Sequence, residues 1–121
     1  MQRGKKKILI ADDDPGILDV LTLFLEEIGY EVQTTGGEAT MRDFQKFSPD
    51  LLLLDVWMSG WSGRDICLLL KSQEATQHLP IILISANNEV ERIARVAGAD
   101  DFLAKPFNLD EVVEKIEHYL A

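Results

Sequence analysis

The chain of 121 residues contains a single cysteine, Cys67, which excludes an internal disulfide framework. Cys67 lies within the apolar run 66–70, so we expect a small buried hydrophobic side chain there rather than a reactive thiol. Internal repeats, low-complexity tracts and linkers rich in proline or serine are also absent. These absences predict one domain over residues 1–121, with a core of about residues 6–120.

Long hydrophobic runs are lacking too. Leu51–Leu54 is among the longest, whereas a membrane-spanning helix needs about 20 apolar residues. The basic start, 1–7, is followed by only four apolar residues, 8–11, before three aspartates arrive, which is too short for a secretory signal. The sequence therefore predicts no membrane association, and nothing in it directs the chain out of the cytoplasm.

Positive charge is scarce. Twelve Lys and Arg residues stand against 21 Asp and Glu residues, which gives a formal net charge of −9. A nucleic-acid-binding surface is normally basic, so direct binding of nucleic acid by this chain is not expected. With 46% hydrophobic residues, the composition is typical of a globular protein.

Strand-like apolar segments alternate with segments of helical periodicity. The expected strands are Lys7–Ala11, Tyr30–Thr35, Leu51–Leu54, Ile81–Ile84 and Asp101–Ala104. The expected helices are Pro15–Ile28 with caps at Asp14 and Gly29, Gly37–Phe47, Arg64–Ser72 with Ile66, Leu69 and Leu70 on its apolar face, Asn88–Ala97, and Leu109–Leu120 with its cap at Asn108. Strands that alternate with single helices predict right-handed crossovers and a mainly parallel sheet.

Polar side chains follow four of the five expected strands. They are Asp12 and Asp13 after the first strand, Asp55 after the third, Ser85 after the fourth and Lys105 after the fifth. In an open parallel sheet the ligand site lies beyond the carboxyl ends of the strands. We therefore expect three carboxylates, a hydroxyl and an ammonium group at one edge of the sheet.

Such a cluster needs a compensating cation, because carboxylates about 5 Å apart repel each other by roughly 1–3 kcal/mol. Lys105 can supply one positive charge, and oxygen ligands favour Mg²⁺ as the source of the rest. Phosphoryl transfer requires an oxygen nucleophile, a metal ion and donors to the phosphoryl oxygens. Each residue taken singly could be a turn, cap or surface residue. Their joint placement instead favours Asp55 as a nucleophile that forms an acyl phosphate.

With these residues in place, the chain resembles the receiver domain of two-component response regulators over about residues 6–120. The matching segments are Ile8–Asp14, Asp50–Asp55, Pro80–Ala86 and Gly98–Phe107. The resemblance implies a flavodoxin-like, doubly wound (βα)5 fold of the α/β class, with a parallel five-stranded sheet in the order 2-1-3-4-5.

The resemblance also implies roles for individual residues. Asp55 is the expected phosphoacceptor. Asp13 and Asp55 are expected to bind Mg²⁺ directly, together with the backbone carbonyl of Trp57, whereas Asp12 acts largely through water. Lys105 is expected to contact the phosphoryl group and to precede a cis peptide bond to Pro106.

A conformational switch is implied as well. Ser85 is expected to move to the phosphoryl group and Phe102 to turn inward after it, which changes the surface of the last two helices and the fifth strand.

The phosphoryl donor is expected to be a sensor histidine kinase or a histidine phosphotransfer protein. The downstream protein target is not identified by the sequence. We expect no enzymatic activity beyond the chain's own phosphorylation and dephosphorylation. The face around Val90, Arg92, Arg95 and Lys115 is the surface that we expect to contact a partner.

Two positions depart from the family pattern. Ser59 stands where the family commonly has proline. Trp57 is bulky for its position, and together with Asn87 it occupies the positions that tune the lifetime of the phosphoryl group in this family. One interpretation is that Trp57 shields the acyl phosphate from water. The alternative is that Trp57 and Trp61 merely cover the loop.

Two other classes of function compete with this interpretation. A small phosphatase of the haloacid dehalogenase type would use the Asp-x-Asp at 12–14, with Ser85 and Lys105 as later motifs. Its acidic residues stand in the wrong order, however, and Asp55 would have no role. A pure interaction module that keeps the fold without being phosphorylated is the second rival, and the complete acidic set argues against it. The sequence leaves open whether the chain is a stand-alone receiver or a piece of a longer regulator.

Overall fold

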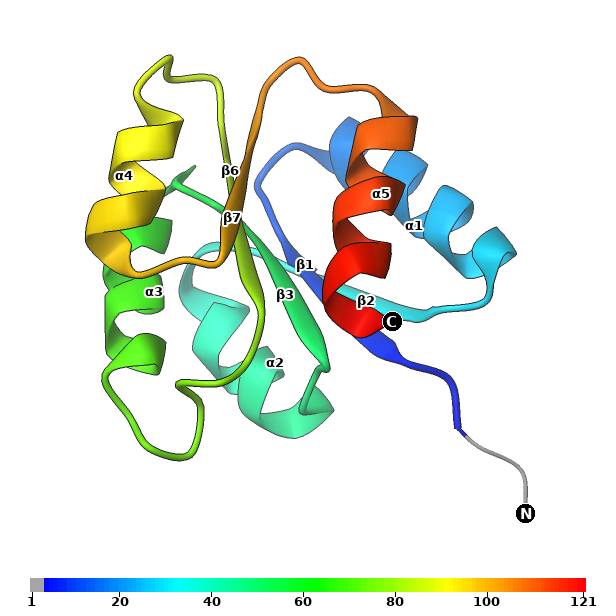
Figure 1. Cartoon of the computed structure of the whole chain (residues 1–121), viewed down its shortest axis with the longest axis horizontal. Coiled ribbons are helices and arrows are strands. Elements are labelled where there is room, and N and C mark those ends of the chain that lie inside the picture. Colours follow the sequence, from blue (N-terminus) through cyan, green and yellow to red (C-terminus); the bar gives the residue numbers. More distant parts are fainter. Residues whose placement is uncertain (1–3) are drawn as a thin grey trace.

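A computed structural model describes residues 4–121 and shows a five-stranded parallel sheet between two layers of helices (Figure 1). The sheet strands are β1 (Lys7–Ala11), β2 (Glu31–Thr35), β3 (Leu51–Asp55), β6 (Ile81–Ser85) and β7 (Asp101–Ala104). Their spatial order is β2-β1-β3-β6-β7. A separate two-stranded sheet pairs β4 (Trp57–Met58) with β5 (Trp61–Ser62). Because β6 and β7 are the fourth and fifth strands of the main sheet, the predicted order 2-1-3-4-5 is confirmed.

The helices are α1 (Pro15–Ile28), α2 (Thr40–Phe47), α3 (Gly63–Lys71), α4 (Val90–Ala97) and α5 (Leu109–Leu120), and a short 3₁₀ helix spans Gly37–Ala39. Helices α1 and α5 cover one face of the sheet, and α2, α3 and α4 cover the other (Figure 1). Each face therefore has its own hydrophobic core. This double cover explains why β3 and β6 are buried at every residue and lack the alternation of a half-exposed strand.

The predicted helix caps are confirmed. The Asp14 side chain accepts a hydrogen bond from the Gly16 N–H at 2.9 Å at the start of α1. Gly29 ends that helix with a φ of 124°, a value that glycine adopts without steric cost. At the start of α5, Asn108 Oδ1 accepts a hydrogen bond from the Glu111 N–H at 2.7 Å. The caps at Asp14 and Asn108 fix where the loops that leave β1 and β7 at the carboxyl edge of the sheet end and the helices begin.

Other sequence expectations need correction. Regular helix α2 begins at Thr40 rather than Gly37, because Gly37 has a φ of 54°, outside the right-handed helical region. Leu69 is 45% exposed, and Cys67 takes its place on the buried face of α3. Val90 is buried, so it does not belong to an exposed partner surface. No helix within residues 4–121 combines the length and apolar character that a bilayer crossing requires.

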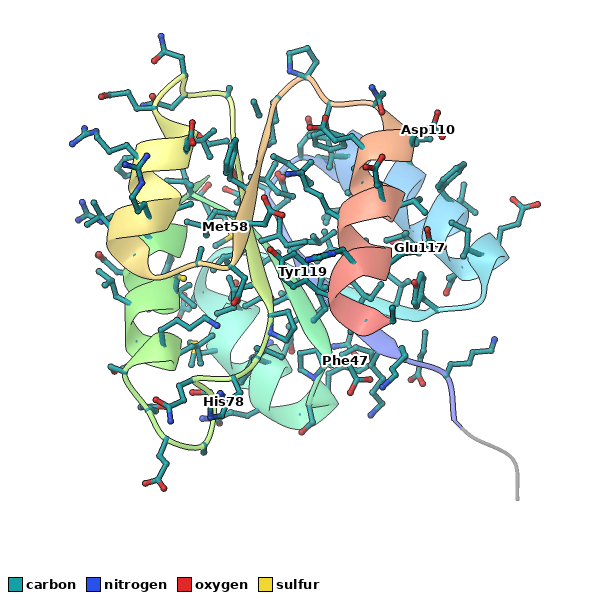
Figure 2. All side chains as sticks on the ribbon, in the orientation of Figure 1. Phe47, Met58, His78, Asp110, Glu117 and Tyr119 are labelled. Atoms are coloured by element: carbon teal, nitrogen blue, oxygen red, sulfur yellow. The ribbon has the colours of Figure 1, made fainter. Side chains whose placement is uncertain are left out.

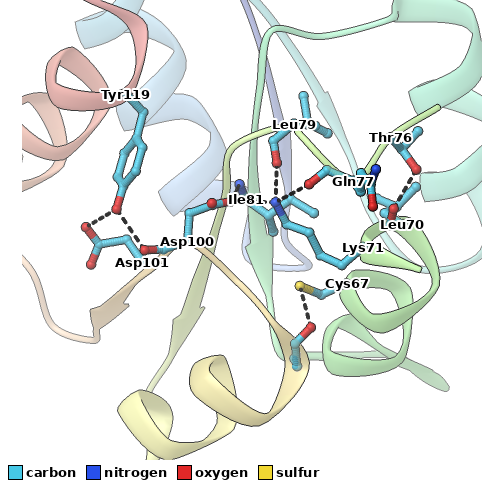
Figure 3. Close-up of polar contacts among 11 residues, drawn as sticks. Cys67, Leu70, Lys71, Thr76, Gln77, Leu79, Ile81, Asp100, Asp101 and Tyr119 are labelled. Carbon is cyan, nitrogen blue, oxygen red and sulfur yellow. Dashed lines mark hydrogen bonds and ion pairs between the residues drawn. The ribbon is translucent and has the colours of Figure 1, made fainter. Parts of the chain in front are cut away.

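A polar network closes the end of the sheet where the strands begin (Figure 3). Lys71 Nζ, at the end of α3, donates hydrogen bonds to the Leu79 carbonyl and to Asp100 Oδ2, each at 2.7 Å. Asp100 Oδ2 also accepts from the Ile81 N–H at 2.8 Å, and Tyr119 Oη donates to the Asp100 carbonyl at 2.7 Å. This network ties α3, β6 and α5 to the start of β7. The residues of the site predicted from the sequence lie at the opposite, carboxyl ends of the strands.

Candidate functional site

The register of the parallel strands brings the predicted residues to one edge. Ala11 pairs with Leu54, so Asp12 follows β1 next to Asp55 at the end of β3. Asp55 pairs with Ile84, which precedes Ser85 at the end of β6. Ser85 pairs with Ala104, and Lys105 follows directly. The chain therefore delivers these side chains from separate segments to the carboxyl edge of the sheet, as the sequence predicts.

Lys105 holds two of the carboxylates together. Its Nζ lies 3.0 Å from Asp12 Oδ2 and 3.6 Å from Asp55 Oδ2. Asp12 is 2% exposed and Asp55 is 7% exposed, so both carboxylates are largely removed from water. Burial of charged groups is costly unless they are paired, and one ammonium group cannot balance two carboxylates. This arrangement leaves an excess of negative charge at the edge of the sheet.

Burial and the excess negative charge together raise the pKa of Asp55. Its pKa is raised to about 6, first by burial and then by the negative charge of Asp12, while the Lys105 ammonium and the Trp57 N–H act in the opposite direction. Above about pH 6 the Asp55 carboxyl group is ionised, because its pKa lies near that value. A bound cation favours the ionised form, so the site is arranged to respond to one.

The oxygen atoms of Asp12 also suit a cation. Asp12 Oδ1 accepts a hydrogen bond from the Asp14 N–H at 2.9 Å. Asp12 Oδ2 is buried and accepts no hydrogen bond, although Lys105 Nζ lies 3.0 Å away. A buried carboxylate oxygen without a hydrogen bond, in a group of oxygen donors, fits a hard divalent ion such as Mg²⁺. We therefore take the residues at this edge to be compatible with the predicted metal.

Asp13 lies outside the group that Lys105 holds together. Its side chain is exposed, and Asp13 Oδ2 accepts hydrogen bonds from both the N–H and the Oγ of Ser59, the latter at 2.9 Å. Among residues 4–121, no three His, Cys, Asp or Glu side chains are grouped closely enough to hold a metal ion between them. The structure thus brings Asp12 and Asp55 together but directs Asp13 toward the β4–β5 hairpin.

Ser85 and Lys105 are neighbours across two strands. Ser85 is buried at the end of β6, and its Oγ accepts a hydrogen bond from the Asn87 N–H at 3.0 Å. The Lys105 N–H donates to the Ser85 carbonyl at 2.9 Å. The peptide bond between Lys105 and Pro106 is cis, as the family resemblance implies. Asn87 is exposed, and its Oδ1 accepts a hydrogen bond from the Glu89 N–H at 2.8 Å, which shapes the turn before α4.

Phe102 lies on β7, partly buried against the core under α3 and α4. Lys115 Nζ, on α5, is 5.1 Å from the centroid of the Phe102 ring and 2.7 Å from Asp101 Oδ1. Figure 2 shows Asp110 at the beginning of α5 and Tyr119 near its end. The aromatic ring predicted to act as a switch is therefore in contact with the surface that α5 and β7 share.

Two features of the site escaped prediction from the sequence. The first is the hairpin of β4 and β5, which follows Asp55 and carries both tryptophans. Trp57 is 66% exposed. The second is Gly63, because a Cβ atom at that position would stand 2.0 Å from the Asp55 carbonyl oxygen. No local pattern marks this glycine, since the close approach arises only when α3 packs against the end of β3.

The doubly wound sheet defines a domain of the α/β class that carries two buried carboxylates paired with a lysine at the carboxyl edge of its sheet. The response regulator receiver domain family matches residues 8–117, and the chain belongs to this family.

Relatives of known name support the assignment. The chain is 38% identical over 118 residues to the phosphate regulon transcriptional regulatory protein PhoB of Rhizobium meliloti. The aligned region covers 94% of this chain and 52% of PhoB. It is 33% identical over 120 residues to the DNA-binding dual master transcriptional regulator RpaA of Synechocystis, covering 94% of this chain and 48% of that protein. The chain thus spans about half the length of these curated relatives.

Solved structures show the same fold. The response regulator TrrA of Thermotoga maritima, in complex with Mg²⁺ and BeF, is 33% identical, with a TM-score of 0.84 and coverage of 94% of this chain and 98% of that one. A response regulator receiver domain protein of Methanospirillum hungatei is 29% identical, also with a TM-score of 0.84. The superposition covers 97% of this chain and 94% of that chain. The flavodoxin-like fold predicted from the resemblance is thereby confirmed.

Proposed function

We propose that residues 1–121 form one receiver domain that accepts a phosphoryl group on Asp55 in a Mg²⁺-dependent reaction. The observation that carries this proposal is the buried pair of Asp12 and Asp55, joined by Lys105 at the carboxyl edge of the sheet. The similar response regulator TrrA was solved in complex with Mg²⁺ and BeF, which supports the choice of metal. The donor is a phosphohistidine of a sensor histidine kinase or of a histidine phosphotransfer protein, and the exchange takes place in the cytoplasm.

In the transfer, an Asp55 carboxylate oxygen forms a bond to phosphorus as the bond between phosphorus and the donor's histidine nitrogen breaks. Mg²⁺, when bound, neutralises charge between the carboxylates and the phosphoryl oxygens. Asp13, Asp55 and the Trp57 carbonyl would hold the ion directly, and Asp12 would hold it through water. Lys105 pairs with a phosphoryl oxygen, and Ser85 Oγ donates a hydrogen bond to another.

The switch follows from these contacts. In this structure Ser85 Oγ accepts a hydrogen bond from the Asn87 N–H, and it loses this hydrogen bond when it turns to the phosphoryl group. Phe102 then turns inward toward the space that Ser85 leaves, and Lys115 loses its aromatic contact. The surface formed by α4, β7 and α5 changes as a result, and an as yet unidentified protein target responds to it. The chain acts on no substrate other than its own Asp55.

Labelling with a small acyl-phosphate donor tests the proposal. Incubation with labelled donor and Mg²⁺ should place about one phosphoryl group on each chain, as seen by intact mass, and removal of Mg²⁺ with a chelator should abolish the labelling. Asp55→Asn should carry no label. Asp65→Asn, which changes an exposed carboxylate on α3, is the matched control and should label as the native chain does.

Three outcomes would point elsewhere. Labelling that persists in Asp55→Asn would assign the acceptor to another residue. Sustained turnover of a generic phosphate ester would favour the phosphatase alternative. Complete absence of labelling from both the small donor and a histidine kinase would favour a pure interaction module.

A further inference from the structure

The hydrogen bonds of Asp13 connect the proposed metal site to the β4–β5 hairpin. Asp13 Oδ2 accepts from the Ser59 N–H and from Ser59 Oγ, the latter at 2.9 Å. Ser59 and Gly60 form the turn between β4 and β5, and Gly60 has a φ of 73°. A single residue thus supplies two donors to one carboxylate oxygen. Charge-assisted hydrogen bonds of this kind are among the stronger polar contacts in proteins.

The same hairpin carries the only two tryptophans of the sequence. Trp57 pairs with Ser62, and Met58 pairs with Trp61, in an antiparallel arrangement around the Ser59–Gly60 turn. Trp57 and Trp61 are both exposed, whereas Met58 is buried and anchors the hairpin to the core. A displacement of the turn therefore changes an exposed aromatic surface directly beside Asp55.

Asp13, in contact with Ser59, lies outside the group of acids at the strand ends. Asp12 and Asp55 share Lys105, but no three acidic side chains among the described residues are close enough to hold an ion together. If Asp13 is to share an ion with Asp55, its carboxylate must turn from the hairpin toward the ion. Mg²⁺ demands a near-octahedral set of oxygen ligands at short distances, so a carboxylate held by two donors elsewhere is a poor ligand.

We propose that Ser59 is a latch on Asp13 that competes with the divalent cation, so that binding of the ion releases the hairpin and moves Trp57 and Trp61. The inference rests on the proposed function, because it takes Asp13 to be a ligand of the metal. Ser59 is then a positioning residue that sets the affinity for the ion. The free energy needed to break the hydrogen bonds between Ser59 and Asp13 reduces the free energy of ion binding. The position of the hairpin then differs between the ion-free and the ion-bound chain.

A magnesium titration of the unphosphorylated chain tests the latch. The binding constant is measured by calorimetry, and tryptophan emission reports the hairpin at the same time. Ser59→Ala removes the hydroxyl donor and keeps the N–H, so it should bind Mg²⁺ about three- to tenfold more tightly than the native chain. Its emission without Mg²⁺ should already be shifted toward that of the loaded native chain. Ser62→Ala is the matched control, because its hydroxyl lies on the same hairpin and caps α3 rather than touching Asp13.

The Ser59 amide proton of the native chain gives a second readout by nuclear magnetic resonance. Its resonance should lose the downfield shift of a hydrogen-bonded amide in parallel with Mg²⁺ saturation. Ser59→Ala binding that is equal to or weaker than native binding, or an amide resonance that Mg²⁺ leaves unchanged, overturns the latch. Asp13→Asn separates the two ideas. Loss of Mg²⁺ binding in that variant upholds Asp13 as a ligand whatever the latch does, whereas native affinity shows that the proposed metal site is itself misassigned.

Discussion

At the residue scale, the positions of the site side chains were predictable because parallel strands end at a common edge. Asp12, Asp55, Ser85 and Lys105 each follow a strand, and the structure brings them together there. The orientation of a carboxylate in a loop was not predictable. Asp13 follows the same strand as Asp12, yet it turns to Ser59, a contact 46 residues away in sequence that depends on where the hairpin folds back.

Trp57 stands two residues after Asp55, and its side chain is 66% exposed. We expect Trp57→Ala to hydrolyse its acyl phosphate faster by roughly three- to tenfold, a change of up to about 1.4 kcal/mol in the barrier, because water reaches the phosphorus more readily. The measurement is the decay of the labelled chain after the donor is removed. Trp61→Ala is the control, since it removes the other exposed ring of the hairpin. An unchanged decay rate in Trp57→Ala would show that the ring merely covers the loop.

At the element scale, periodicity predicted every strand and helix of the main fold, since each is long enough to show an apolar pattern. The β4–β5 hairpin was missed because strands of two residues carry no periodic signal. The buried face of α3 was partly wrong for a related reason. Five consecutive apolar residues, 66–70, do not determine which side faces inward, and contact with α4 places Cys67 rather than Leu69 inside.

The start of α3 depends on the absence of a side chain at Gly63. A methyl group there would stand 2.0 Å from the Asp55 carbonyl oxygen, so either α3 or the end of β3 must move. We expect Gly63→Ala to lower the free energy of unfolding by about 1–3 kcal/mol, as overpacking does, and to slow labelling of Asp55 because the backbone beneath it shifts. Urea unfolding and the labelling rate measure the two effects.

Gly4→Ala is the matched control, since its added methyl group would meet no atom within 4 Å. Its stability should stay within about 0.5 kcal/mol of the native chain. If Gly63→Ala unfolds and labels like Gly4→Ala, the close approach of α3 to Asp55 does not constrain the site.

At the scale of the whole molecule, the fold stabilises a site that by itself opposes folding. Both faces of the sheet are covered by apolar side chains, and the network of Lys71 and Asp100 ties the far end of the strands. At the carboxyl edge, Asp12 and Asp55 are buried with a single ammonium group. The stability that the rest of the molecule supplies therefore keeps this unbalanced charge buried at the edge of the sheet.

The buried charge of Asp55 predicts how the free energy of unfolding depends on pH. The pKa of Asp55 rises from 3.8 to about 6 on folding, so between these values the folded state binds more protons than the unfolded state. Stability contributed by this group is therefore lost as pH rises through that window, to an extent on the order of 3 kcal/mol. Asp55→Asn removes the charge, and it should be more stable than the native chain at about pH 8 and nearly equal to it at about pH 4.

Urea unfolding at several pH values, with and without Mg²⁺, measures this difference. Binding of Mg²⁺ to the folded native chain should raise its stability by RT ln(1 + [L]/Kd), whereas Asp55→Asn, which lacks one of the proposed ligands, should gain less. Asp19→Asn, an exposed change on α1, is the control and should follow the native curve. A native chain as stable as Asp55→Asn at about pH 8 without Mg²⁺ would mean that the ammonium of Lys105 already balances the buried charge. In that case the site would have no electrostatic need for a cation, and the reason to expect Mg²⁺ there would disappear.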